Sequence, residues 1–133
     1  MEYQFAIVDA ISKGDEEAVL FLLRIGASLH KVDEFGRTPL HWTAFTNGGE
    51  RLVPLLVSHG AHLNTRDGLG QTALHLHCMN GRAYGVGCLL FHGADVNIRT
   101  KTTKLTALQI ASANKNNELT TILLAYGATA GDV

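Results

Sequence analysis

The stretch Gly68-Leu-Gly70-Gln-Thr-Ala73 has the glycine spacing of a dinucleotide-binding loop, G-x-G-x-x-G/A. In that loop the glycines follow a strand and open a helix, so that backbone N–H groups approach a pyrophosphate. The sequence around this stretch lacks the alternating strand and helix pattern that such a loop requires. We therefore interpret it as a turn that leads into a helix, and we predict no nucleotide or other cofactor.

Seven histidines raise the question of a metal site. His75 and His77 are two positions apart on a predicted helix, so their side chains point to different faces and cannot bind one ion. The sequence contains neither His-Glu-x-x-His nor Cys-x-x-Cys spacing, the two patterns that most directly indicate zinc. No metal site is predicted.

The remaining reactive side chains do not form a catalytic arrangement. Cys78 and Cys88 precede or follow apolar residues on predicted helices, which is typical of small buried side chains rather than nucleophiles. No spacing of Ser, His and Asp indicates a triad, and neighbouring carboxylates occur only in the segments 15–17 and 33–34. We predict that the protein is not an enzyme.

The whole chain has 133 residues and a formal net charge of −1. This charge argues against broad electrostatic binding to nucleic acid or to an anionic membrane. No apolar run approaches the roughly 20 residues of a membrane helix, and the first residues lack a secretory signal. Two cysteines and no Asn-x-Ser/Thr site favour an intracellular location, in the cytoplasm or the nucleus.

Two markers recur along the whole sequence. Gly-Ala pairs begin at Gly26, Gly60, Gly93 and Gly127, with separations of 34, 33 and 34 residues. Thr-x-Leu segments begin at Thr38, Thr72 and Thr106, each 34 residues after the last. Two independent markers that keep one period indicate a repeat protein.

Each repeat contains two short helices and an extended segment. Threonine can cap the first helix, and glycine after the second suits the left-handed position that ends a helix. The predicted helices are 3–13, 16–25, 39–47, 50–58, 73–80, 83–91, 107–115 and 117–126. Helices of about ten residues are marginally stable alone, so the units must stack. Stacking is expected to bury one continuous core, made of Leu40, Leu74, Leu108 and the apolar pairs 22–23, 56–57, 89–90 and 123–124.

The segments Gly36-Arg-Thr-Pro-Leu-His41 and Gly93-Ala-Asp-Val-Asn97 resemble the two signature segments of the ankyrin repeat. The resemblance covers essentially the whole chain. It implies an all-α repeat solenoid of stacked helix-turn-helix units with short β-hairpin fingers, and structural roles for His41 and His75 between repeats. Members of this family usually bind other proteins through the finger tips and the concave face.

The chain is predicted to form one ankyrin-repeat domain, 1–133. It divides into an N-terminal capping repeat 1–32, repeat 2 at 33–66, repeat 3 at 67–99 and a C-terminal capping repeat 100–133. Polar residues at both ends fit caps, so four repeats are expected to form the whole array.

Three segments depart from the repeat pattern. Repeat 2 has an extra residue near Asn47-Gly48-Gly49, and Pro54 lies near the start of its second helix. Gly85 and Gly87 each cost a helix about 1 kcal/mol relative to alanine, so the helix 83–91 is predicted to be the weakest. The finger 99–104 lacks the usual Asp and Gly, which leaves its conformation open.

Large apolar residues occupy positions that the repeat leaves exposed. Phe35 and Leu69 are predicted at finger tips, Phe45 and Met79 near the ends of two first helices, and Trp42 is predicted to pack inward. Such an apolar patch with a polar rim has the composition of a binding hot spot. The predicted partner-binding residues are Glu34, Phe35, Arg37, Phe45, Thr46, Leu69, Gln71, Met79, Asn80, Lys101 and Asn114.

Charge is distributed unevenly, with −4 over residues 1–34 and +3 over residues 71–104. The basic finger 99–104 can orient an acidic element of a partner. The leading hypothesis is a monomeric, non-catalytic adaptor or inhibitor that docks a protein on repeats 2 and 3.

Other hypotheses stay open. The chain resembles in size the inhibitors of cyclin-dependent kinases, which shorten the first helix of their second repeat, whereas 39–47 is predicted as a full helix here. An inhibitor of a transcription factor, a structural spacer and a fragment of a longer scaffold are further alternatives. Asn64 and Asn97 follow a leucine by eight residues, the spacing of asparagine hydroxylation sites in the fingers of this family.

Overall fold

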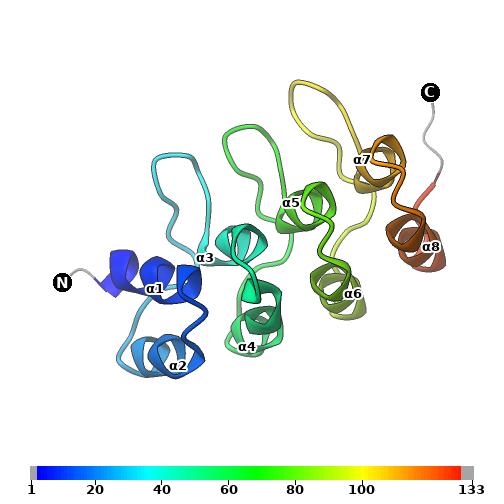
Figure 1. The fold of residues 1–133 in the computed structure, drawn as a ribbon. Coiled ribbons are helices and arrows are strands. Elements are labelled where there is room, and N and C mark those ends of the chain that lie inside the picture. Colours follow the sequence, from blue (N-terminus) through cyan, green and yellow to red (C-terminus); the bar gives the residue numbers. More distant parts are fainter. Residues whose placement is uncertain (1–2, 130–133) are drawn as a thin grey trace.

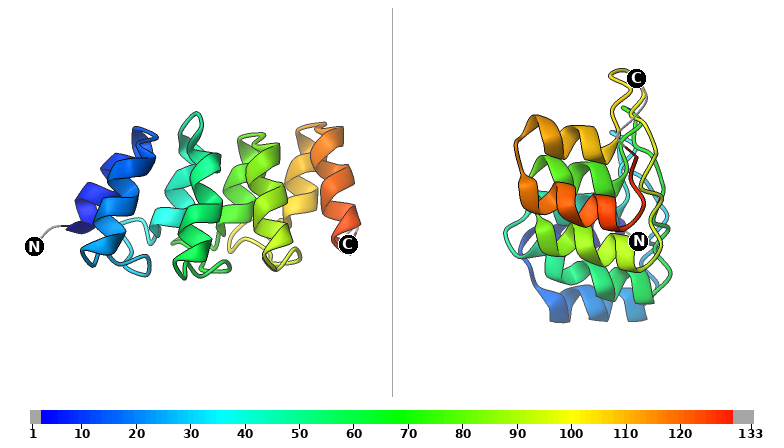
Figure 2. Two further views of the ribbon diagram at one scale, coloured as in Figure 1. Left: turned by 90° about the horizontal axis from the view of Figure 1, so that it is seen from below. Right: turned by 90° about the vertical axis from the view of Figure 1, so that its right-hand side faces the viewer.

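The computed structural model describes residues 3–129, so residues 1–2 and 130–133, at the ends of the first and fourth predicted repeats, lie outside the described residues. Four pairs of helices stand side by side in chain order, and a finger projects between successive pairs (Figure 1). Figure 2 shows the same order from below, and from the end of the stack it shows the fingers on one side of the helices. The predicted all-α repeat fold is confirmed.

The helices alternate between a first and a second position within each pair. The first helices are α1 (Tyr3–Ser12), α3 (Pro39–Trp42), α5 (Ala73–Met79) and α7 (Ala107–Ala113). The second helices are α2 (Glu16–Arg24), α4 (Val53–Ser58), α6 (Ala83–Phe91) and α8 (Asn117–Ala125). In the second pair, α3 continues into the 3₁₀ helix η1 (Thr43–Phe45), and α4 is preceded by the 3₁₀ helix η2 (Gly49–Leu52).

The ends of the helices follow the sequence signals. The Thr72 hydroxyl accepts a hydrogen bond from the His75 N–H, and the Thr106 hydroxyl accepts one from the Gln109 N–H. These bonds satisfy N–H groups that have no partner within the helix. The four Gly-Ala glycines that follow the second helices have φ between 94° and 107°, the left-handed conformation that ends a helix at low cost.

The prediction of an α-helix over 39–47 is wrong. The α-helix stops at Trp42, and Thr46 is already extended. The Thr43 hydroxyl donates to the Leu40 carbonyl at 2.7 Å, a bond that competes with the helical pattern. After this turn the chain passes close to Thr43 again at Gly49. A Cβ on Gly49 would lie 2.6 Å from the Thr43 carbonyl oxygen, so only glycine fits there.

The second helix of this pair starts differently from the prediction as well. Residues 49–52 form a 3₁₀ turn, and the α-helix begins at Val53 with Pro54 in its first turn. A proline there lacks only an N–H that the helix would leave unpaired. The predicted position of Pro54 near the start of the second helix is confirmed.

The fingers are hairpin-like loops, and the described residues contain no strand. Each loop is closed at its base by one N–H donating to a carbonyl, from Asp33 to Arg37, Asp67 to Gln71 and Thr100 to Leu105. Neighbouring fingers are joined by Gly68 N–H donating to the Phe35 carbonyl and Lys101 N–H donating to the Leu69 carbonyl, both at 2.9 Å. These single bonds set the spacing of the fingers without making a sheet.

The third finger replaces the usual Asp and Gly with other residues of similar function. The Thr100 hydroxyl accepts from the Leu105 N–H at 2.9 Å, where Asp33 and Asp67 use a carboxylate in the first two fingers. Lys104 takes φ of 60°, close to the 76° of Gly70 in the preceding finger. The third finger is therefore closed in the same way as the first two, at the expense of a strained lysine.

The core runs through all four pairs. Leu40, Leu74 and Leu108 are buried, as are the first members of three apolar pairs, Leu56, Leu89 and Leu123. Full burial of each such side chain contributes about 1.5–3 kcal/mol. Leu22, Leu23 and Val57 are half-buried against this core. The expectation fails for Leu124, which is 54% exposed.

We expect Lys115→Gly to raise the free energy of unfolding by about 0.5–1 kcal/mol. Lys115 has φ of 57° in the turn between α7 and α8, where the first and third pairs have Gly14 and Gly81 at 66° and 67°. Urea unfolding followed by circular dichroism measures the change. Asn114→Gly is the control, because Asn114 has an ordinary φ of −86°; an equal gain there would contradict the explanation from strain.

Candidate functional site

The base of the first finger is organised around Arg37. Its guanidinium carbon lies 5.6 Å from the ring centre of Phe35, 5.5 Å from that of Trp42 and 4.8 Å from that of Phe45. The Nε atom donates to Asp67 Oδ2 of the next finger at 3.3 Å. Arg37 thus holds three aromatic rings in place and joins two fingers, a role that the sequence did not reveal.

Asp33 fixes the other side of this cluster. Its Oδ1 accepts the N–H groups of Phe35 and Arg37, and its Oδ2 accepts the indole N–H of Trp42 at 2.8 Å. Partial burial favours the neutral acid, but the bonds from Arg37, Phe35 and Trp42 outweigh it and lower the pKa of Asp33. The ionised carboxylate therefore anchors Trp42, which was predicted to pack inward and is half-buried, with part of its side chain against the core.

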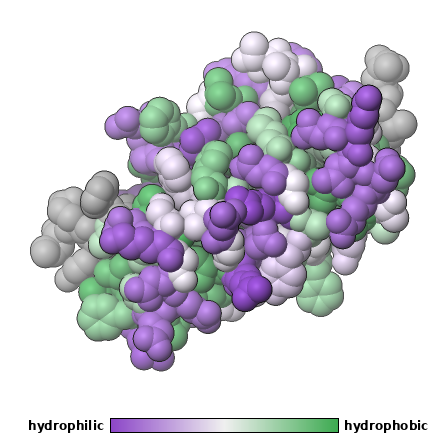
Figure 3. All heavy atoms as spheres, in the orientation of Figure 1, coloured by the Kyte–Doolittle hydropathy of each residue, from purple (hydrophilic) through white to green (hydrophobic). Residues whose placement is uncertain are grey.

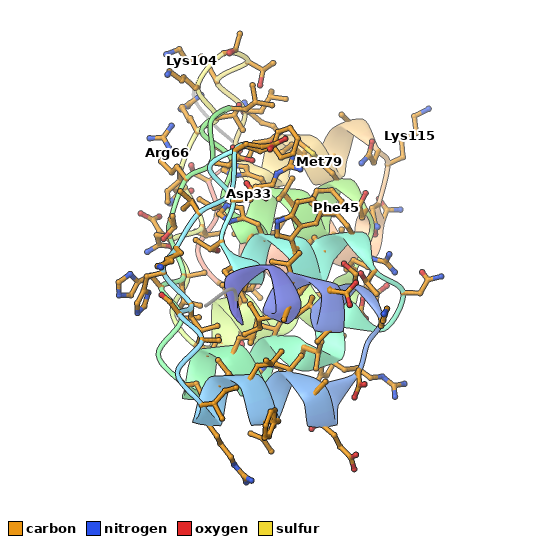
Figure 4. The ribbon with its side chains drawn as sticks, turned by 90° about the vertical axis from the view of Figure 1, so that its left-hand side faces the viewer. Asp33, Phe45, Arg66, Met79, Lys104 and Lys115 are labelled. Carbon is orange, nitrogen blue, oxygen red and sulfur yellow. The ribbon has the colours of Figure 1, made fainter. Side chains whose placement is uncertain are left out.

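The structure brings the four predicted apolar residues to one side of the molecule. Phe35, Phe45, Leu69 and Met79, here called the concave patch, are 53%, 41%, 55% and 38% exposed. Figure 4 shows Phe45 and Met79 in the corner between the fingers and the first helices, with Asp33 beside them. Phe35 and Leu69 both line a hollow of about 650 Å³ between the first two fingers.

A second hollow of about 430 Å³ lies at the base of the first finger. It is lined by Val8 of α1, by Val32 and Phe35, and by Trp42. Its walls are mostly apolar and its mouth carries Lys31 and Glu34. This is the size and character of a pocket for one large apolar side chain.

The residues of the predicted polar rim differ in exposure and in hydrogen bonding. Glu34, Asn80, Lys101 and Asn114 are exposed, whereas Arg37, Thr46 and Gln71 are half-buried. The Asn80 amide donates to the Ala44 carbonyl at 2.8 Å, which ties α5 to the 3₁₀ turn of the preceding pair. Arg37 and Asn80 thus stabilise the surface on which they lie.

His41 and His75 link successive repeats, as the family resemblance implies. Each accepts on Nδ1 from the N–H of the threonine three residues earlier, so the proton resides on Nε2. The Nε2 atoms lie 3.0 Å from the Gln71 carbonyl and 2.9 Å from the Ile98 carbonyl. Burial favours the neutral ring and lowers the pKa of both histidines.

His77 is a third buried histidine, and its role was not predicted. Its Nε2 lies 2.9 Å from the Thr43 hydroxyl, which already gives its own proton to Leu40. Nε2 must therefore carry the proton, and the lone pair of Nδ1 has no hydrogen-bond partner in the described residues. Desolvation, with Arg82 nearby, lowers the pKa of His77 to about 4.

The other reactive groups have structural surroundings. Cys78 is buried, and burial raises the pKa of its thiol to about 12, while Cys88 is only half-buried. Within residues 3–129, no three His, Cys, Asp or Glu side chains are placed to hold a metal ion. A Cβ on Gly70 would lie 2.5 Å from the Lys101 nitrogen, so this glycine of the dinucleotide-like pattern permits contact with the next finger.

Sequence reasoning missed an apolar surface on the second helices. Phe21, Tyr84, Phe91 and Leu124 are 60%, 53%, 74% and 54% exposed there. Figure 3 shows hydrophobic side chains gathered at the lower left, over α2, and hydrophilic ones across the middle. The repeat register offered a signal, because Phe91 occupies a position that the other repeats fill with Arg24, Ser58 and Ala125.

Comparison with protein families identifies the repeats. The family described as "Ankyrin repeats (3 copies)" matches residues 7–100. Comparison with curated proteins gives no significant match. In the part of the chain that the structure describes, no helix is long and apolar enough to cross a membrane.

Proposed function

Because the chain belongs to the ankyrin-repeat family, whose repeats mediate protein–protein interaction, we propose that it is a non-catalytic adaptor or inhibitor that docks a partner protein on repeats 2 and 3. The observation that carries the proposal is the concave patch: four large apolar side chains exposed together beside two hollows. Large apolar surfaces with a polar rim are typical of binding hot spots. The chain would act as a monomer before it binds.

The surroundings of the patch support docking onto a preformed surface. Phe35 and Phe45 lie against the Arg37 guanidinium, which Asp67 holds from the next finger. Side chains that are already ordered lose less conformational entropy on binding, so more of the contact energy contributes to affinity. Aromatic anchors of this kind commonly contribute most of the binding energy.

Replacing Phe35, Phe45 and Met79 with Asp is expected to abolish capture of the partner. Three charges would be placed in a surface that the partner must desolvate. The tagged protein and the triple variant are compared by affinity capture from native extract and mass spectrometry. Circular dichroism and urea unfolding show whether the variant is folded.

A matched control places the same substitutions on the second helices. Phe21→Asp, Phe91→Asp and Leu124→Asp also alter exposed apolar residues and should leave the captured proteins unchanged. Retention of the same proteins by the concave variant, or their loss from the control alone, would refute the proposed site.

One observation favours a second candidate, a regulatory subunit or inhibitor of a protein kinase. The first α-helix of the second pair is shortened to Pro39–Trp42, the feature that kinase inhibitors of similar size are expected to have. Recovery of a kinase in the capture experiment would favour this candidate over an inhibitor of a transcription factor. Recovery of no partner would favour a structural spacer.

We also propose that the protein acts inside the cell, in the cytoplasm or the nucleus. The two cysteines are unpaired, one buried and one half-buried, which suits a reducing compartment.

A further inference from the structure

Four basic side chains gather in the second and third fingers. Arg66, Arg99, Lys101 and Lys104, here called the basic finger cluster, are all exposed. In residues 3–129 the ion pairs are Lys13 with Asp9 and Arg37 with Asp67. None of the four basic side chains is therefore paired with a carboxylate in the described part of the chain.

The cluster is ordered by the backbone of the fingers. Arg66 donates from Nη2 to the Arg99 carbonyl at 2.7 Å and from Nε to the Gly70 carbonyl at 3.3 Å. Arg99 donates from Nη1 to the Lys104 carbonyl at 3.1 Å. A Cβ on Gly70 would lie 2.9 Å from Arg66 Nη2 and 2.5 Å from the Lys101 nitrogen. These contacts hold two guanidinium groups beside the lysine-bearing tip.

The arginine side of the cluster faces away from the concave patch, whereas Lys101 borders the patch, because its N–H donates to the carbonyl of Leu69. Figure 4 shows Arg66 on the opposite side of the fingers from Phe45 and Met79, and Lys104 at the tip. Because Arg66 lies away from Phe45 and Met79, binding to the cluster can be tested separately from binding to the concave patch.

We propose that the basic finger cluster binds an acidic segment of a protein, a short run of Asp or Glu residues. Each guanidinium uses part of its donor set on the backbone and keeps further N–H groups for a carboxylate, with which arginine forms charge-assisted hydrogen bonds. Since residues 1–34 carry a net charge of −4, a long polyanion or an anionic bilayer would be repelled beyond the fingers, whereas a short acidic segment would not.

The test uses a fluorescein-labelled hexaglutamate peptide and measures anisotropy in 50 mM salt. We expect saturable binding that weakens as the salt concentration rises. Arg66→Gln with Arg99→Gln should weaken binding about tenfold. The control Arg24→Gln with Arg51→Gln removes the same charge from two other exposed arginines and should change binding little.

A second pair of substitutions distinguishes loss of charge from loss of finger structure. Lys101→Gln with Lys104→Gln removes two charges and none of the hydrogen bonds described above, and it should weaken binding severalfold. The concave triple variant should bind the peptide normally, which separates this proposal from the proposed function. Absence of saturable binding, or equal weakening by the control pair, would overturn the proposal.

Two further probes test the class of ligand. Vesicles containing phosphatidylserine and a single-stranded oligonucleotide of twelve thymidines present phosphates instead of carboxylates. Weaker binding of both than of the peptide supports an acidic protein segment. Binding of either as tight as that of the peptide would overturn that assignment.

Discussion

Gly85→Ala is expected to destabilise the protein by about 3 kcal/mol, although helix propensity alone predicts a gain. Gly85 lies in the middle of α6, where alanine is normally favoured by about 1 kcal/mol. An added Cβ would meet atoms of the His77 ring, with Cε1 at 2.6 Å and Nδ1 closer still. Both residues are buried, so the ring has no free space into which it could move.

Gly87→Ala is the matched control for this substitution. Gly87 lies two residues later in the same helix, and a Cβ there would have no neighbour within 4 Å. This variant should be stabilised by about 0.5–1 kcal/mol, since only propensity and unfolded-state entropy change. Urea unfolding of the two variants gives the difference directly. Equal stabilisation by both would contradict the close approach of Gly85 to His77.

A double-mutant cycle tests the pair itself. In a His77→Ala background the space against Gly85 is empty, so adding Gly85→Ala should be neutral or favourable. The coupling free energy should then be about 3 kcal/mol. A value near zero would mean that the effect of Gly85→Ala has another cause.

The contrast between Gly85 and Gly87 shows what the sequence could and could not predict. Period and spacing predicted the pairs of helices and the glycines that end them, and the family resemblance implied the two histidines that link repeats. These features are local or recur in each repeat. The sequence marked both α6 glycines as weak points, but the need for Gly85 arises from His77 on another helix, a contact that no spacing within one helix reveals.

The prediction of a full helix over 39–47 failed for a related reason. The repeat pattern predicted a helix through 39–47, but the α-helix ends at Trp42. Thr43 bonds backward to Leu40 and also receives a hydrogen bond from His77 in the next repeat. The inserted glycines make room for this turn. Its end was thus set by a tertiary contact, which overrides a weak local preference.

The exposure of the residues in the concave patch could be predicted from the repeat register, because every repeat places the same positions outward. The contacts that hold these residues in place could not be predicted. Arg37 looks in the sequence like a free rim charge, yet it is held among three rings and Asp67. The basic finger cluster was predicted only in part, because Arg66 belongs to the preceding finger and joins Arg99 across 33 positions.

His77 also gives the protein a marked sensitivity to acid. The pKa of His77 is about 4 in the folded protein against 6.5 for an unperturbed histidine. Between these values the unfolded chain binds a proton that the folded protein does not, so stability falls as pH decreases. The slope is about 1.4 kcal/mol per pH unit, and about 3 kcal/mol is lost between pH 6.5 and 4. His41 and His75 add to this loss in the same direction, because burial lowers the pKa of each.

His77→Gln isolates the contribution of this one ring. The glutamine amide can donate to the Thr43 hydroxyl but does not titrate. In the variant, the number of protons taken up on unfolding at acidic pH should therefore be smaller by about one, and the slope of stability against pH should be correspondingly shallower. Free energies of unfolding are measured in urea at pH 7.5, 6.5, 5.5 and 4.5, with Trp42 fluorescence as the probe. The variant should be less stable than the parent at pH 7.5 and approach it at pH 4.5. His59→Gln, which removes an exposed histidine, is the control for the loss of an imidazole. An unchanged slope in His77→Gln would mean that this imidazole takes up its proton in the folded protein as readily as in the unfolded chain.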